Sequence, residues 1–139
     1  MLATTHVIIP LVIMDMLRDY FLKHKHRRLI PRKYIFFVGI GGILPDIDIA
    51  LGYLLRFFSI EVPPWLHHGR ITHSIFIPIF LFVVAGLLWK DTKFSKGKSK
   101  KHIHSWFLIT TLVAIGVVSH ILLAWLFHEE WRHNIKKFF

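Results

Sequence analysis

The sequence has 139 residues, about the length of one domain. Hydrophobic residues make up 54% of it, the formal net charge is +10 and the mean hydropathy is +0.51. This composition excludes a disordered chain, argues against an ordinary soluble domain and favours a small, all-α polytopic membrane protein. Since there is no cysteine, the chain can have no disulfide, no thiolate zinc site and no thiol nucleophile.

Four apolar stretches approach the roughly 20 residues that a helix needs to cross a bilayer. In chain order they cover residues 6–22, 34–58, 73–89 and 105–127. We therefore predict a single domain, a bundle of four transmembrane helices. The second helix is expected to be broken, because three glycines precede Pro45, and proline lacks a backbone donor and clashes with the preceding turn.

Basic residues are concentrated in two connections between these stretches. Residues 23–33 carry six Lys and Arg and no acid, and residues 90–101 carry six Lys and one Asp. The positive-inside rule predicts that both connections are cytoplasmic, so both termini and the 59–73 connection face outward from a plasma or inner membrane. Nucleic-acid binding is not expected, because no base-reading groups interleave the charges. Membrane lipid is the expected environment, and a homo-oligomer is compatible with the sequence.

Ionisable side chains inside the apolar stretches are costly, which makes each of them a functional candidate. With a rise of about 1.5 Å per residue, those in the second and fourth stretches lie roughly 18–21 Å from the inner end. The predicted topology brings six side chains to the outer side: His6, Asp46, Asp48, His68, His73 and His120. Imidazole and carboxylate are the ligands expected of zinc, with Mn²⁺ or Fe²⁺ as alternatives.

A purely structural role is the alternative for these carboxylates. Asp46 and Asp48 would then pair with Arg56 or Arg70, although two carboxylates in one span are expensive unless they are used. Arg70 could instead hold the anionic part of a substrate.

Two further local expectations concern helix geometry. Thr72 is the expected N-cap of a helix that begins at His73. Asp15 is expected to pair with Arg18, three residues further along the same helix.

Several ordered motifs resemble those of the YdjM-like membrane-bound metal-dependent hydrolases, also described as LexA-binding inner-membrane-associated hydrolases. The motifs are the N-terminal MLATTH ending at His6, GILPDID at residues 42–48, His68 followed by Thr72-His73-Ser74, and Ser119-His120. The resemblance implies a helical membrane protein whose His and Asp bind metal. It implies the same six residues as candidates for metal binding.

The sequence departs from the family pattern at one position that bears on the metal. The family commonly has an Asp four residues after the histidine of the Ser-His motif, where this chain has Ala124. Ala124 is either natural to a divergent member or an introduced, inactivating substitution. Because residues i and i+4 share a helix face, the missing carboxylate is expected to weaken the site. His128 continues this face and is an accessory candidate. A more distant resemblance is to the helical zinc-dependent phospholipase C family.

The expected function is a metal-dependent hydrolase, with zinc favoured, that attacks a lipid or lipid-phosphate ester with a metal-activated water. The first-choice ligands are His6, Asp46, His73 and His120. Asp48 or His68 would complete the ligand shell or act as general base and acid, and Arg70 would bind substrate. The alternatives are a non-catalytic metal-binding or transport protein, and a scaffold whose polar side chains only join helices by hydrogen bonds.

Overall fold

The structure is a computed structural model that describes residues 3–25, 30–66 and 72–127. Within these ranges all regular structure is helical, which confirms the all-α prediction. The predictions for His68, Arg70 and His128 lie outside the described residues.

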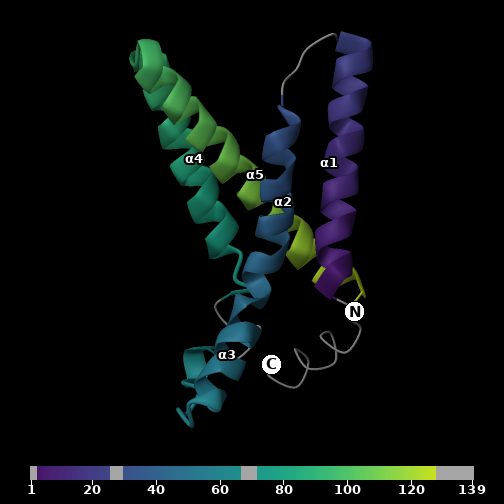
Figure 1. The fold of residues 1–139 in the computed structure, drawn as a ribbon, viewed down its shortest axis with the longest axis vertical. Helices are drawn as coiled ribbons and strands as arrows, with labels where there is room; N and C mark the ends of the chain where they lie inside the picture. Colours follow the sequence, from purple (N-terminus) through teal and green to yellow (C-terminus); the bar gives the residue numbers. More distant parts are fainter. Residues whose placement is uncertain (1–2, 26–29, 67–71, 128–139) are drawn as a thin grey trace.

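The helices follow one another with short connections (Figure 1). In chain order they are α1 (Ala3–Lys25), α2 (Arg32–Ile43), η1 (Leu44–Asp46), α3 (Ile47–Phe57), η2 (Pro64–Leu66), α4 (Phe76–Phe94) and α5 (Gly97–Phe127). The second apolar stretch is interrupted as expected. A single turn of 3₁₀-helix that contains Pro45 separates α2 from α3.

Helix α5 is the central element of the bundle, since it packs against both α2 and α4, while α1 packs mainly against α2. A small apolar core of Met14, Ile35, Val38 and Leu112 joins α1, α2 and α5. Helix α3 continues beyond this bundle at the lower end of the molecule (Figure 1). The C-terminal end of α2 and the following η1 therefore contact α5 where α3 departs.

Two segments are long and apolar enough to cross a membrane, Arg32–Phe57 and Gly97–Leu126. Four such helices were predicted, and within the described residues two are found. Helix α1 falls short because Asp15, Arg18 and Asp19 interrupt it. Helix α4 falls short because its last turns carry Lys90, Asp91 and Lys93, which leaves too few consecutive apolar residues.

The predicted cap of the third helix is wrong. Helix α4 begins at Phe76 with Ile75 at the N-cap and no side-chain cap, while the Ser74 hydroxyl accepts a bond from the Phe76 N–H at 3.3 Å. The Thr72 hydroxyl donates elsewhere, to the carboxylate of Asp48 at 2.7 Å. Because α4 begins at Phe76, Thr72 precedes the N-cap by three residues and does not reach the first free N–H groups of the helix.

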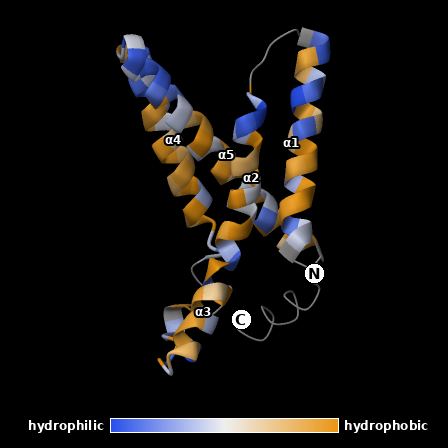
Figure 2. Cartoon of the chain, viewed as in Figure 1, coloured by the Kyte–Doolittle hydropathy of each residue, from blue (hydrophilic) through white to orange (hydrophobic). Residues whose placement is uncertain are grey.

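The surface polarity is divided along the length of the bundle. Hydrophilic residues gather at the upper ends of α1, α2, α4 and α5, and apolar residues cover the middle of these helices (Figure 2). Many large apolar side chains are exposed there, among them Ile13 and Met16 on α1 and Phe80 and Val83 on α4. A surface of this kind is suited to contact with lipid.

Candidate metal centre

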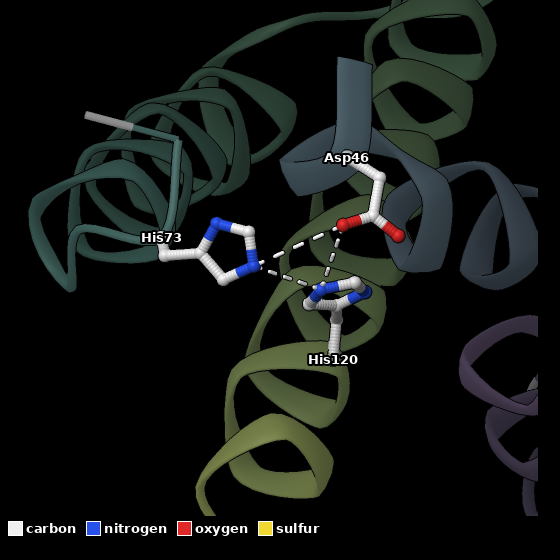
Figure 3. Close-up of side chains that lie close together, drawn as sticks. All are labelled: Asp46, His73 and His120. Atoms are coloured by element: carbon white, nitrogen blue, oxygen red, sulfur yellow. Dashed lines mark hydrogen bonds and ion pairs between the residues drawn. The ribbon is translucent and has the colours of Figure 1, made fainter. Parts of the chain in front are cut away.

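Three side chains from separate parts of the chain meet at the lower end of the bundle (Figure 3). Asp46 comes from η1, His73 from the turn before α4, and His120 from α5. The Nε2 atoms of the two histidines are 3.2 Å apart. Asp46 Oδ1 lies 3.5 Å from Nε2 of His120 and 3.9 Å from Nε2 of His73. The cluster therefore presents two nitrogens and one oxygen to a common point.

These separations fit the ligand atoms of one metal ion. With bonds of about 2.0–2.1 Å, two ligand atoms at tetrahedral angles around zinc lie roughly 3.3 Å apart. The three observed separations, from 3.2 to 3.9 Å, are close to that value. A centre of two imidazoles and one carboxylate also has the composition and ligand number of catalytic zinc sites, which keep a further position open.

His120 is held in one tautomer by a backbone group. Its side chain is almost fully buried, and its Nδ1 is 2.7 Å from the carbonyl oxygen of Gly42 on α2. A carbonyl can only accept a hydrogen bond, so Nδ1 carries the proton and donates it. The neutral ring then directs the unprotonated Nε2 toward Asp46, as a metal-binding histidine does.

Asp48 and Thr72 fix the orientation of His73 in a similar way. The Thr72 hydroxyl donates to Asp48 Oδ2 at 2.7 Å, and its oxygen lies 3.3 Å from Nδ1 of His73. Because the only hydroxyl proton is directed to the carboxylate, the Thr72 oxygen is the acceptor and Nδ1 of His73 is the donor. Nε2 of His73 is then unprotonated and faces the cluster.

The hydrogen-bond network therefore turns three electron-rich atoms toward one point. Two imidazole lone pairs and a carboxylate oxygen repel one another at these distances unless a cation lies among them. A bound divalent ion or a captured proton would relieve this repulsion. The donor set and its spacing fit a zinc ion.

His6 and Asp48 lie beside the cluster, although both were predicted as ligands. The His6 ring is buried and stacks on the His120 ring, with centroids 4.3 Å apart. The close packing of α1 on α2 holds it there, since a Cβ at Gly42 would lie only 2.6 Å from the His6 carbonyl oxygen. Among the described residues, the group whose ligand atoms all lie within 4.8 Å of one another holds neither His6 nor Asp48. Asp48 contacts the cluster through Thr72.

Of the other predicted positions, Ala124 and the pair of Asp15 and Arg18 lie in the described part of the chain. Ala124 is half-buried on α5, one helical turn beyond His120. The predicted pair on α1 is confirmed, since Arg18 Nη1 lies 3.2 Å from Asp15 Oδ1, and it also contacts Asp19. The contacts of Thr72 and of the Gly42 carbonyl with the two histidines were not predicted. The proximity of Thr72 to His73 was visible, but a backbone carbonyl gives no sequence signal.

Comparison with known proteins places the chain in one family. Neither the curated proteins nor the solved structures include a significant match. The family described as YdjM inner membrane protein matches residues 1–129, which is most of the 139-residue chain and includes the whole cluster. The chain therefore belongs to the YdjM inner membrane protein family.

Proposed function

We propose that this protein is a membrane-embedded, metal-dependent hydrolase that acts on a lipid or lipid-phosphate ester. The observation that carries the proposal is the convergence of Asp46 Oδ1 with the unprotonated Nε2 atoms of His73 and His120. The exposed apolar surface of the bundle supports lipid as the substrate, since a lipid can reach this end of the molecule without leaving the membrane.

A bound zinc ion, or Mn²⁺ or Fe²⁺ in its place, would activate a water molecule and polarise the bond under attack. His73, His120 and Asp46 would hold the ion. The Gly42 carbonyl and the Asp48–Thr72 pair orient the two imidazoles before any ligand arrives. Such outer partners commonly change metal affinity by about 10–100-fold.

We infer further that α1 and α4 cross the membrane beside α5 and the segment of α2 and α3. The charges within α1 are partly neutralised, because Arg18 contacts both Asp15 and Asp19. The hydrophilic helix ends lie together (Figure 2), and because residues 23–33 and 90–101 are basic, this supports a cytoplasmic location for that end. The metal centre and both termini would then be extracytoplasmic.

Metal binding tests the first part of the proposal. We expect the full-length protein in detergent to bind about one zinc ion, and His73→Ala and His120→Ala to bind it at least roughly tenfold more weakly. His104→Ala is the matched control, because His104 is exposed on the same helix as His120. A wild-type protein that takes up no metal on titration would overturn the proposal and support a hydrogen-bonded scaffold.

Turnover separates an enzyme from a metal carrier. We expect the zinc-loaded protein to hydrolyse at least one member of a panel of lipid phosphoesters, and a chelator or His120→Ala to abolish this activity. Ala124→Asp restores a carboxylate one turn from His120 and should raise both metal content and turnover. If Ala124→Asp and wild type bound the same amount of metal, residue 124 would not contribute to the metal site. Metal uptake without turnover on any ester would favour the carrier.

A further inference from the structure

A cavity of about 160 Å³ lies along α3, beside the metal centre. Its wall includes Asp48, Gly52 and Arg56, which are four residues apart and therefore share one face of the helix. Val62 and Leu66, from the segment after α3, contribute apolar surface. The cavity thus has two charged residues on one helix face and apolar residues from the segment that follows this helix.

Asp48 connects this cavity to the metal centre. The same side chain lines the cavity and accepts the Thr72 hydroxyl that contacts His73. Arg56 lies two turns further along α3, about 12 Å of helix rise from Asp48. Both residues line the same cavity, so the cavity extends from the neighbourhood of the cluster to Arg56.

The charge of Arg56 is available to a ligand. Within the part of the chain that the structure describes, no carboxylate forms an ion pair with it. A guanidinium recognises phosphate through paired N–H donors. Asp48 opposes an anion, but its side chain is only 2% exposed and its oxygens accept bonds from the Ile49 N–H and the Thr72 hydroxyl.

The surroundings of the cavity indicate that its ligand has apolar chains. Helix α3 projects beyond the bundle and exposes Leu51, Leu54 and Phe57 (Figure 1). In the proposed topology α3 is the outer part of its membrane span, so it ends near the boundary between acyl chains and headgroups. A lipid phosphate is found at that same depth.

We propose that this cavity binds the phosphate group of a lipid, with Arg56 as the residue that holds it. The identification of this lipid as the substrate rests on the proposed hydrolase function. The binding itself does not require a metal.

Two substitutions test the cavity in different ways. Arg56→Gln removes the charge. Gly52→Leu fills the space, and it is sterically permitted because a Cβ at Gly52 meets no atom within 4 Å. The matched controls are Arg32→Gln, at a mostly exposed arginine on α2, and Gly86→Leu, at an equally open glycine on α4.

The experiment is a calorimetric titration of the full-length protein in detergent with a chelator present. The probe is short-chain dihexanoyl phosphatidic acid. We expect wild type and both controls to bind the probe with equal affinity. Arg56→Gln should bind it at least roughly tenfold more weakly, because a charge-assisted contact is lost. Gly52→Leu should weaken binding to a similar extent, because the added side chain occupies the cavity. Dihexanoylglycerol, which lacks the phosphate, and inorganic phosphate, which lacks the chains, should both bind more weakly than the probe.

Three results would overturn the inference. If Arg56→Gln bound the probe as tightly as wild type, Arg56 would not hold the phosphate. If dihexanoylglycerol bound as tightly as the probe, the phosphate would not be recognised. If inorganic phosphate bound as tightly as the probe, the acyl chains would not be recognised. Because the chelator is present throughout, these results are independent of the metal centre. Failure of wild type to bind zinc would overturn the proposed hydrolase and leave the phosphate cavity standing.

Discussion

The rings of two histidines in the cluster are oriented by neighbours that lie outside it. The Gly42 carbonyl accepts from His120, and the Thr72 oxygen accepts from His73. Asp48 acts one step further out, by taking the Thr72 proton. Asp48 therefore contacts His73 through Thr72, while its predicted role as a ligand or a general base stays a prediction.

Thr72 provides a test of this arrangement at the scale of a single residue. We predict that Thr72→Val weakens zinc binding by roughly tenfold, because His73 loses the acceptor that orients its ring. Thr72→Ser keeps the hydroxyl and should restore wild-type affinity. Zinc titration measures the effect, and circular dichroism checks that the variants are folded. If Val and Ser at this position gave the same affinity, the hydroxyl would have no role in positioning His73.

The crossing of α2 and α5 is the element-scale feature on which the metal centre depends. A Cβ at Gly41 would overlap the backbone carbonyl of Val113, and one at Gly116 would lie 2.8 Å from the Cα of Gly41. The two backbones are therefore in direct contact, as small residues allow in membrane helices. This close approach brings the Gly42 carbonyl within 2.7 Å of His120.

Gly116→Ala tests the close approach. The added methyl group must push α5 away from α2, and we predict a loss of about 1–3 kcal/mol in stability together with weaker zinc binding. Gly86→Ala is the control, because a Cβ there meets no atom within 4 Å and alanine favours a helix by up to about 1 kcal/mol. Unfolding in a denaturing detergent measures both variants. A Gly116→Ala protein as stable as wild type would show that the helices need not touch.

At the scale of the whole molecule, polarity is distributed along one axis. The hydrophilic helix ends lie at one end of the bundle and apolar surface covers its middle (Figure 2), while the candidate metal centre lies near the other end, where α3 departs. Such a distribution orients the molecule relative to a membrane, because basic residues near spans are retained in the cytoplasm.

The absence of cysteine makes this orientation directly measurable. Ser59, just beyond α3, and Lys98, at the start of α5, are both exposed and lie on opposite sides in the proposed topology. We predict that Ser59→Cys reacts with a membrane-impermeant maleimide in intact spheroplasts, whereas Lys98→Cys reacts only after permeabilisation. The reverse pattern would place the metal centre in the cytoplasm.

Several features of the fold could be predicted from the sequence because they depend on local properties. Hydropathy indicated the helical membrane class, and the glycines before Pro45 indicated the break that the structure places at residues 44–46. The prediction of four spans relied on apolar stretches alone. It is met by two, because the charges in α1 and at the end of α4 shorten the apolar runs.

For the candidate site, the sequence could predict how far along each helix the polar side chains lie, but not which of them touch. Rise per residue placed Asp46 and His120 at one level of the membrane, and they do meet. The rotation of each helix about its axis decides whether a side chain at that level reaches its neighbour. In the structure Asp48 faces Thr72 and lies outside the group formed by Asp46, His73 and His120.

Local properties of the sequence are sufficient to predict the helical class, the helix break, the two basic connections and a common depth for several costly polar side chains. The packing of the helices sets which of these side chains touch, which histidine nitrogens face one another, and where the cavity lined by Arg56 lies. Hydropathy and helical rise act along the chain, so they carry no information about these contacts. The contacts of the metal centre join residues as far apart as Gly42 and His120, and these depend on close backbone packing that no single segment specifies.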